Sequence, residues 1–420
     1  RAHMGYGHPG FWMLPTKNTR DRATAMMPAL LAERMGELGL DFCVMYPTGG
    51  FATAMQNDDE VRRAACRAFN IFSAEYFADY SNQMTPAAVI PMHTPDEAIE
   101  EIAYVRESLE LKACLFSGMV PRSVPAATEG DPKAHRLGSV TYDVFGIDSP
   151  YDYDPVWAAC LEYGVSPTFH SGGRGYALRR SPTNFTYNHI GHFASTGEAI
   201  CKAMFLGGVT RRFPQLRMGF LEGGTAWACQ LYADLIEHWE KRNRTALEYN
   251  DPANLDHGLM IDLASEFGPD GMAELMVDRD HALFAALNTA ASTNDGGQLE
   301  LDDYAPCEIK TEEDIADLFV PNFYFGCEAD DRLNATAFNT GVNPMGARIN
   351  ALFSSDIGHF DVIHMNRVLP HAWELVEDGV MDLDDFREFT FANPARFWTA
   401  NDPNFFAGTT VEAEVAQLLQ

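Results

Sequence analysis

The sequence has few basic residues and no long apolar run. Thirty Lys and Arg stand against sixty Asp and Glu in 420 residues, which gives a formal net charge of −30. This charge repels phosphate backbones and anionic lipid, so we expect neither nucleic acid nor a membrane surface as a partner. No segment approaches the ~20 continuous apolar residues that a membrane-spanning helix needs. We therefore expect the partner to be a small-molecule substrate.

Cysteines are few and lack the spacing of a metal site or a redox motif. The eight cysteines are scattered, none forms a CxxC pair, and most lie inside apolar stretches. This usage is typical of reduced core thiols in a cytoplasmic protein. The first residues, "RAHMGYGHPGFW", also lack the apolar core of a signal peptide. We expect a cytoplasmic protein.

Several motifs of common enzyme classes are missing. The sequence contains no GxGxxG at a strand–helix junction, no Walker loop and no GxSxG elbow. The missing motifs therefore argue against three protein classes: dinucleotide-binding folds, P-loop nucleotidases and α/β-hydrolases.

What the sequence does contain is an alternation of short apolar runs and helical stretches. Hydrophobic residues make up 46% and aromatic residues 12%, enough for a large core. Seven runs are typical of buried parallel strands: 41–47, 86–92, 112–118, 165–172, 217–224, 323–330 and 351–356. Helical patterns are found at 24–38, 59–80, 94–109, 155–163, 196–205, 226–242 and 361–378.

This alternation predicts an α/β fold, a (β/α)8 TIM barrel, in which helices cover a parallel sheet. Seven strands are one fewer than a closed barrel needs. The helix predicted at 24–38 leads directly into the first strand found, so we expect the barrel's own first strand to be absent from this sequence. We expect residues 1–420 to form a single domain.

Two long connectors interrupt the pattern. The connector at 119–154 follows a strand and is rich in Pro, Gly and aromatic residues, so we expect a lid or pocket wall over the mouth of the barrel. The connector at 288–317 is polar and acidic, and we expect it to be a surface insertion or a partner contact.

Ionisable residues follow several of the predicted strands. His170 ends "TFH", Glu222 follows "GFL", Glu328 follows "FGC" and Asp356 follows "FSS". Because the carboxyl ends of parallel strands meet at one face of a barrel, where barrel active sites are built, we expect these four side chains to converge. Each alone could cap a strand or form a structural ion pair; together they favour an active site. Imidazole and carboxylate are ligands suited to zinc, manganese or iron.

The segments "TFHSGG", "GGVTRRFPQLRMGFLEGG" and "FSSDIGHFD", in this order, resemble the amidohydrolase superfamily, in the branch of aminocarboxymuconate-semialdehyde decarboxylase. The closing "FREFTFANPARFW" is similar to the helix after the last strand in that branch. The resemblance implies a metal-dependent hydrolase-type barrel and a divalent metal, zinc first and manganese second. It implies His170 and Asp356 as metal ligands. The H-x-H pair that the branch places on its first strand has no counterpart, because His3 and His8 are separated by "MGYG".

The resemblance also places further residues around this site. Where the branch commonly has a histidine after strand six, this chain has Glu222, which could act as a general base or bind the metal. His189, His192 and Glu328 are further catalytic candidates, and each could instead be structural. Arg174 could bind a substrate carboxylate as a bidentate fork, and His359 could bind substrate or orient Asp356.

These observations predict a metal-dependent hydrolase or carbon–carbon lyase that acts on a small carboxylated or aromatic-derived substrate, by decarboxylation or hydrolysis. The alternative is a catalytically altered binding or scaffold member that has lost the first-strand ligands. The family and the second connector lead us to expect a homodimer.

Overall fold

The computed structural model describes residues 17–124, 129, 140–170, 177–249, 254–276 and 302–420. Its centre is a curled parallel sheet of seven strands in the order β1-β2-β3-β6-β7-β8-β9. The strands are β1 (Cys43–Met45), β2 (Met84–Ile90), β3 (Ala113–Ser117), β6 (Pro167–His170), β7 (Met218–Phe220), β8 (Phe323–Glu328) and β9 (Asn350–Ser354). All seven predicted strands are confirmed. The sheet is a half-barrel, and β1 and β9 are its outer strands among the described residues.

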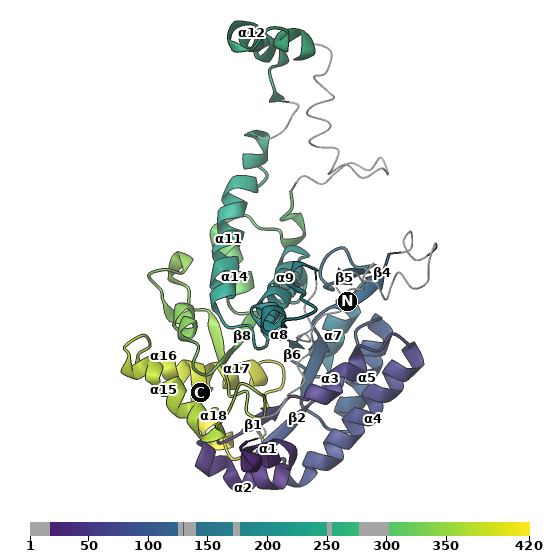
Figure 1. Ribbon diagram of the computed structural model, residues 1–420, viewed down its shortest axis with the longest axis vertical. Helices are drawn as coiled ribbons and strands as arrows, with labels where there is room; N and C mark the ends of the chain where they lie inside the picture. The colour runs from purple at the N-terminus through teal and green to yellow at the C-terminus, as the bar shows by residue number, and fades with distance from the viewer. Residues whose placement is uncertain (1–16, 125–128, 130–139, 171–176, 250–253, 277–301) are drawn as a thin grey trace.

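Helices follow the strands and cover the sheet (Figure 1). Five match the predicted helices to within a few residues: α4 (Asp59–Phe77), α5 (Pro95–Glu107), α7 (Asp154–Glu162), α9 (His192–Leu206) and α11 (Ala226–Arg242). A sixth, α15 (Val368–Glu377), begins seven residues later than predicted, because 361–367 hold a loop and a short 3-10 turn. The others are α3 (Thr48–Ala54), α8 (Phe185–His189), α10 (Val209–Arg212), α12 (His257–Phe267), α14 (Glu312–Phe319), α16 (Leu383–Arg387), α17 (Asn393–Thr399) and α18 (Glu412–Leu418). A π-helical turn at Glu388–Ala392 joins α16 to α17 in the segment expected after the last strand.

The single helix predicted at 24–38 is wrong in one respect, because the structure has two helices there. They are α1 (Thr19–Met26) and α2 (Pro28–Leu38). Proline disfavours helical geometry in the residue before it, and Met27 is extended, with φ −125° and ψ 105°. Pro28 then serves as the first residue of α2, where no amide donor is needed.

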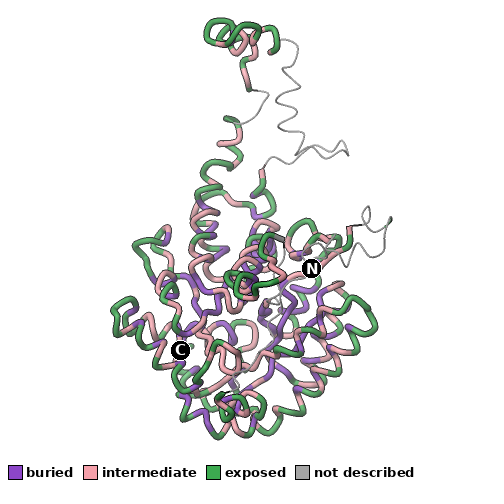
Figure 2. Tube along the Cα trace, viewed as in Figure 1, coloured by how far each residue is buried: buried purple, intermediate pink, exposed green. Residues whose placement is uncertain are grey.

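The main core lies between the sheet and the helices, and buried residues gather along the strands (Figure 2). Phe169 on β6, Phe220 on β7 and Phe325 on β8 stack across adjacent strands, with centroid distances of 5.5 and 5.9 Å. A second apolar cluster joins the other face of the sheet to α17 and α18, through residues such as Leu115, Tyr324 and Phe397. Packed aromatic rings therefore join the neighbouring strands β6, β7 and β8.

The first connector is more ordered than a loop in its described part. Two short strands, β4 (Val120–Ser123) and β5 (Val140–Asp143), form an antiparallel pair; residues 125–128 and 130–139 lie outside the described residues. Arg122 bonds both Asp143, at 2.6 Å, and the hydroxyl of Tyr153, at 3.0 Å. The Tyr153 hydroxyl donates to the carbonyl of Met92, just after β2, at 2.6 Å. This pair of strands is thus fastened to the sheet edge where β2 and β3 end.

The described part of the second connector, 302–317, is largely exposed or half-buried and is anchored to the rest of the fold by a few buried side chains. It contains most of α14, whose Ile315 and Phe319 are fully buried. The hydroxyl of Tyr304 donates to the carbonyl of Leu235 on α11 at 2.8 Å. Residues 288–301 lie outside the described residues.

Candidate active site

The four predicted strand-end residues follow four adjacent strands. His170 ends β6 and Glu328 ends β8, while Glu222 and Asp356 each stand two residues after their strands, β7 and β9. Because these strands are parallel neighbours, their carboxyl ends share one edge of the sheet. The structure thus brings together the four side chains that the sequence singled out.

Two of these residues have an unusual backbone. Glu222 has φ 60° and Asp356 has φ 46°, both in the left-handed region that residues other than glycine seldom adopt. Such strained conformations collect at functional sites, where the surrounding structure enforces them. After Glu222 the chain needs glycine, because a Cβ on Gly223 would lie 2.8 Å from Nε1 of Trp227. The backbone here is shaped to present two carboxylates.

The side chains form one connected set, which we call the acid–histidine cluster: His170, Glu222, Glu328, Asp356, His359 and Asp361. One ligand atom each of Glu222, Asp356 and His359 lie within 4.8 Å of one another. A second group, with the same spread, contains Glu328, Asp356 and Asp361. His170 joins the cluster through Glu222, since its Nε2 lies 2.7 Å from Glu222 Oε2.

Buried oxygens without hydrogen bonds indicate what the cluster could hold. Glu222 Oε1 is buried and makes no hydrogen bond among the described residues. Asp356 Oδ2 is also buried and lacks normal hydrogen-bond geometry, although His359 Nδ1 lies 3.3 Å away. Buried carboxylate oxygens are costly without a compensating partner. Two carboxylates and an imidazole at this spacing fit a divalent cation such as zinc or manganese.

Burial and the nearness of other negative charges raise the pKa values of two acidic residues in the cluster. Burial, together with Asp361, Asp356 and Glu222, raises the pKa of Glu328 to about 7. Burial and Glu222 raise the pKa of Asp356 to about 6, against the opposing effect of His359. Perturbed acids of this kind at a strand-end edge are typical of functional sites.

His359 is the positive centre of the cluster. Burial alone would lower its pKa, but hydrogen bonds and charge from Asp356 and Asp361 outweigh burial and raise the pKa to about 10. Without a bound cation, a ring with this pKa is protonated at neutral pH, and its Nδ1, 2.7 Å from Asp361 Oδ1, is placed to donate to that carboxylate. The pKa of Asp361 is lowered: burial opposes this, and His359 prevails. Asp361 was not predicted as a site residue, although its position two residues after His359 was a usable signal.

Aromatic rings surround the histidines of this edge. The ring of His170 has its centroid 4.9 Å from Phe193 and 5.9 Å from Phe51. His189, on α8, lies 5.4 Å from Phe360 and 6.2 Å from His359, centroid to centroid. Burial lowers the pKa of His189. None of the three phenylalanines was predicted, because a lone phenylalanine in a sequence looks the same in a core and in a site wall.

Of the remaining predicted residues, the structure describes His192 but not the others. His192 begins α9 and is buried, with its ring 5.6 Å from that of Phe193. Arg174, His3 and His8 lie outside the described residues. The role of Arg174 as a carboxylate-binding residue stays a prediction, as do the catalytic roles of His189, His192, Glu222 and Glu328.

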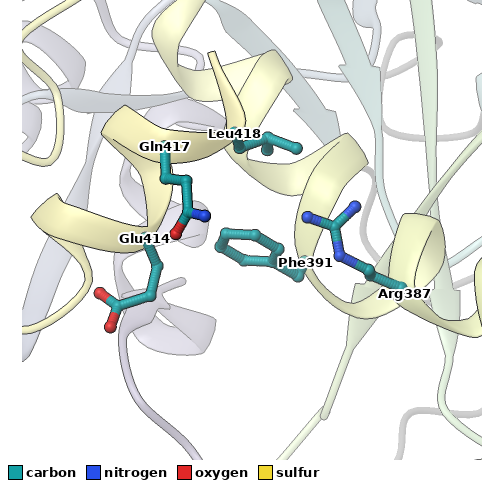
Figure 3. Close-up of a pocket in the computed structure, with 5 residues that line it drawn as sticks. All are labelled: Arg387, Phe391, Glu414, Gln417 and Leu418. Carbon is teal, nitrogen blue, oxygen red and sulfur yellow. The ribbon is translucent and has the colours of Figure 1, made fainter. Parts of the chain in front are cut away.

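A separate pocket of about 330 Å³ lies between α18 and the segment that joins α16 to α17 (Figure 3). Its lining consists of Arg387, Phe391, Glu414, Gln417 and Leu418. This lining contains no predicted site residue, and the guanidinium of Arg387 already lies over the ring of Phe391, 5.5 Å from its centroid. The acid–histidine cluster is the better candidate for a reaction centre.

A parallel half-barrel with ionisable residues gathered at the carboxyl ends of its strands has the organisation of a barrel-type enzyme. Among the described residues, no helix is both long and apolar enough to cross a membrane.

The sequence matches no curated protein. The family model described as amidohydrolase matches residues 40–272, more than half of the chain. The chain therefore belongs to the amidohydrolase family.

Solved structures share this fold. An amidohydrolase from Mycobacterium avium subsp. paratuberculosis K-10 matches with a TM-score of 0.53 and 18% identity, over 89% of this chain and 74% of the other. A dihydroxybenzoic acid decarboxylase from Polaromonas sp. JS666, with bound manganese and the inhibitor 2-nitroresorcinol, matches with a TM-score of 0.50 and 14% identity. That match covers 90% of this chain and 87% of the other. These likenesses confirm the TIM-barrel type of fold.

Proposed function

We propose that this chain is a divalent-metal-dependent enzyme that decarboxylates a small carboxylated aromatic or aromatic-derived acid. The observation that carries the proposal is the convergence of Glu222, Asp356 and His359, with ligand atoms within 4.8 Å of one another at the strand ends. The dihydroxybenzoic acid decarboxylase with bound manganese, which has a similar fold, supports this choice over hydrolysis.

The residues proposed to hold the cation are His170, Asp356 and Glu222, with His359 beside them. A bound divalent cation would supply positive charge that orients the substrate's oxygens and stabilises developing negative charge. The buried Oε1 of Glu222, which has no hydrogen-bond partner in the described part of the chain, and the buried Oδ2 of Asp356 are the atoms that favour this assignment. The 2.7 Å contact with Glu222 fixes the ring of His170 at the end of β6.

The walls of the site favour a planar substrate. Phe51, Phe193 and Phe360 surround the histidine rings, and such faces accept an aromatic ring by offset or edge-on packing. Arg174, four residues after His170 in the sequence, is the residue that we propose for the substrate carboxylate, since a guanidinium binds carboxylate through two parallel hydrogen bonds.

Decarboxylation breaks the bond between the ring carbon and the carboxylate carbon, and the electron pair stays on the ring carbon. That carbon must then take up a proton. His189 is the proposed donor, because it lies beside Phe360 and His359 on the wall of the site. Glu328 and His192 are proposed as supporting acid–base groups.

Product analysis in heavy water tests this function. The protein, loaded with manganese or zinc, is given a set of hydroxylated benzoates, and the products are analysed by mass spectrometry. We expect release of carbon dioxide and one deuterium on the ring carbon that carried the carboxylate. In ¹⁸O-labelled water, incorporation of label into an acid product would instead establish a hydrolase. The absence of turnover together with the absence of bound metal would favour a binding or scaffold role.

A further inference from the structure

Helix α12 has an exposed apolar face. It lies beyond the end of α11, apart from the sheet and its covering helices (Figure 1). Leu259, Leu263 and Phe267 are 54%, 43% and 75% exposed. Their spacing of four residues places them on one side of the helix. Soluble chains normally bury such a stripe, so this face is suited to contact with another surface.

In the segment that carries this face, the Asp and Glu residues are not balanced by any Lys or Arg. Residues 256–276, which we call the arm, contain five Asp and Glu and no Lys or Arg. Two arms would repel each other if they paired directly. The charge of the arm therefore favours a partner surface that is apolar and basic.

Such a surface lies beside the candidate active site. Residues 177–190, which we call the basic rim, contain Arg179 and Arg180 and no Asp or Glu, in a chain whose net charge is −30. The rim exposes Leu178, Tyr187 and Ile190, at 90%, 54% and 68%. The Tyr187 hydroxyl donates to the carbonyl of Leu178 at 2.7 Å, and Arg179 Nη1 donates to the carbonyl of Ile190 at 3.3 Å. These bonds hold the exposed apolar groups together.

We propose that the arm of one copy of this chain docks on the basic rim of a second copy. Each chain carries both complementary surfaces, so a two-fold dimer forms the contact twice. The rim includes α8 and therefore His189, whose ring lies 6.2 Å from that of His359. In this dimer the docked arm therefore lies beside the partner's α8, at the edge of the acid–histidine cluster. This inference does not depend on the reaction that the site performs.

The first test is the oligomeric state by analytical ultracentrifugation. We expect the wild-type chain to form a dimer whose dissociation constant rises with salt. The arm variant Leu263→Ser/Phe267→Ser and the rim variant Arg179→Glu/Arg180→Glu should each be monomeric at the same concentration. We expect each lost apolar residue to raise the dissociation constant roughly tenfold. A monomeric wild-type chain, or a rim variant that dimerises as the wild type does, would overturn the proposal.

Mixing the two variants separates this arrangement from other dimers. A mixed pair has one contact in which both surfaces are damaged and one in which both are intact. We therefore expect dimers to reappear, at reduced affinity, only when the arm variant and the rim variant are combined. If no dimer reappears on mixing, the arm and the rim do not bind each other and the proposal fails.

A matched control removes exposed apolar area elsewhere. Phe72 on α4 is 53% exposed and stacks on Tyr76 at 5.1 Å. Phe72→Ser should leave the dimer unchanged. If Phe72→Ser dissociates the dimer while the arm variant does not, the interface lies on α4 and the proposal is wrong. Far-ultraviolet circular dichroism of all variants verifies that each one folds.

Discussion

Individual residues carry most of the chemistry inferred here. The backbones of Glu222 and Asp356 are both left-handed, and each carboxylate has a buried oxygen that makes no normal hydrogen bond to any residue that the structure describes. A strained conformation that also leaves a polar atom unsatisfied lowers stability, so a ligand that binds those atoms would offset the loss. This combination distinguishes the two residues from the many solvated acids of the chain.

Removal of single ligand atoms should weaken metal binding enough that the chain no longer retains the ion after free metal is removed. We expect Asp356→Asn and His170→Ala each to weaken the binding of zinc or manganese by at least about tenfold to hundredfold, with the fold retained. Isothermal titration and elemental analysis measure the change. Asp384→Asn, an exposed acid on α16, is the control and should bind metal as the wild type does. Unchanged binding in both site variants would mean that the assigned ligands are wrong.

A histidine outside the cluster should make stability depend on pH. Burial, with the nearby Arg62 and Arg122, lowers the pKa of His93 from 6.5 to about 4, while Asp59 opposes the shift. Glu97 on α5 is the other charged group near the ring, with Oε1 3.9 Å from Nδ1. Neither ring nitrogen makes a hydrogen bond among the described residues.

The direction of this dependence follows from proton binding. Between pH 6.5 and about pH 4, His93 is protonated in the unfolded chain but not in the folded chain. The contribution of the neutral His93 ring to the free energy of unfolding is therefore fully present above pH 6.5 and is lost as the pH falls toward 4. We expect the free energy of unfolding to be about 2 kcal/mol lower at pH 5 than at pH 7.5 through this residue. Urea unfolding of His93→Phe should lose that part of the dependence, and the exposed-residue control His238→Gln should keep it.

At the scale of elements, the sequence predicted the strands well because each is a short buried run of apolar residues. It predicted the strand-end acids for the same reason, since a polar residue after such a run stands out. The pair β4 and β5 was missed, because "VPRS" and "VTYD" are half exposed and owe their pairing to Arg122 and Asp143, which are 21 residues apart. No local pattern reveals a contact of that kind.

The contact of Arg122 with Asp143 should determine how firmly this pair of strands is held. The Asp143 side chain is 1% exposed, and Arg122 is the cation that pairs with it. We expect Arg122→Ala to lower the free energy of unfolding by about 3 kcal/mol, because a buried carboxylate loses its counter-charge. Arg332→Ala breaks an exposed pair with Asp378 and should cost under about 1 kcal/mol. Equal losses in the two variants would contradict this account.

The open edge of the sheet shows another limit of sequence reasoning. β1 pairs with β2 only at Met84, Thr85 and Pro86. Further along β2, the side chain of Asn70 on α4 replaces a strand: it accepts from the Val89 amide at 2.7 Å and donates to the Val89 carbonyl at 3.0 Å. An asparagine within a helix carries no sign of this role, because the role exists only where α4 meets β2.

For the whole molecule, the alternation of strands and helices was enough to predict the TIM-barrel type of fold, and the resemblance of three segments at the strand ends predicted the family. The membership of the cluster could not be fully predicted, because it depends on loop conformation. His359 was expected to contact substrate or orient Asp356, and the structure places one of its ring nitrogens within 4.8 Å of ligand atoms of Glu222 and Asp356, where the deprotonated ring could also bind the cation. The exposure of α12 could not be predicted either, since its apolar spacing is the same as that of a buried helix.

The central claim is that the acid–histidine cluster holds a divalent metal. Elemental analysis of the purified chain, after incubation with zinc or manganese and removal of free metal, tests it most directly. We predict about one metal ion per chain in the wild type and none in Asp356→Asn. A wild-type chain that retains no metal, or an Asp356→Asn variant that retains as much as the wild type, would contradict the account.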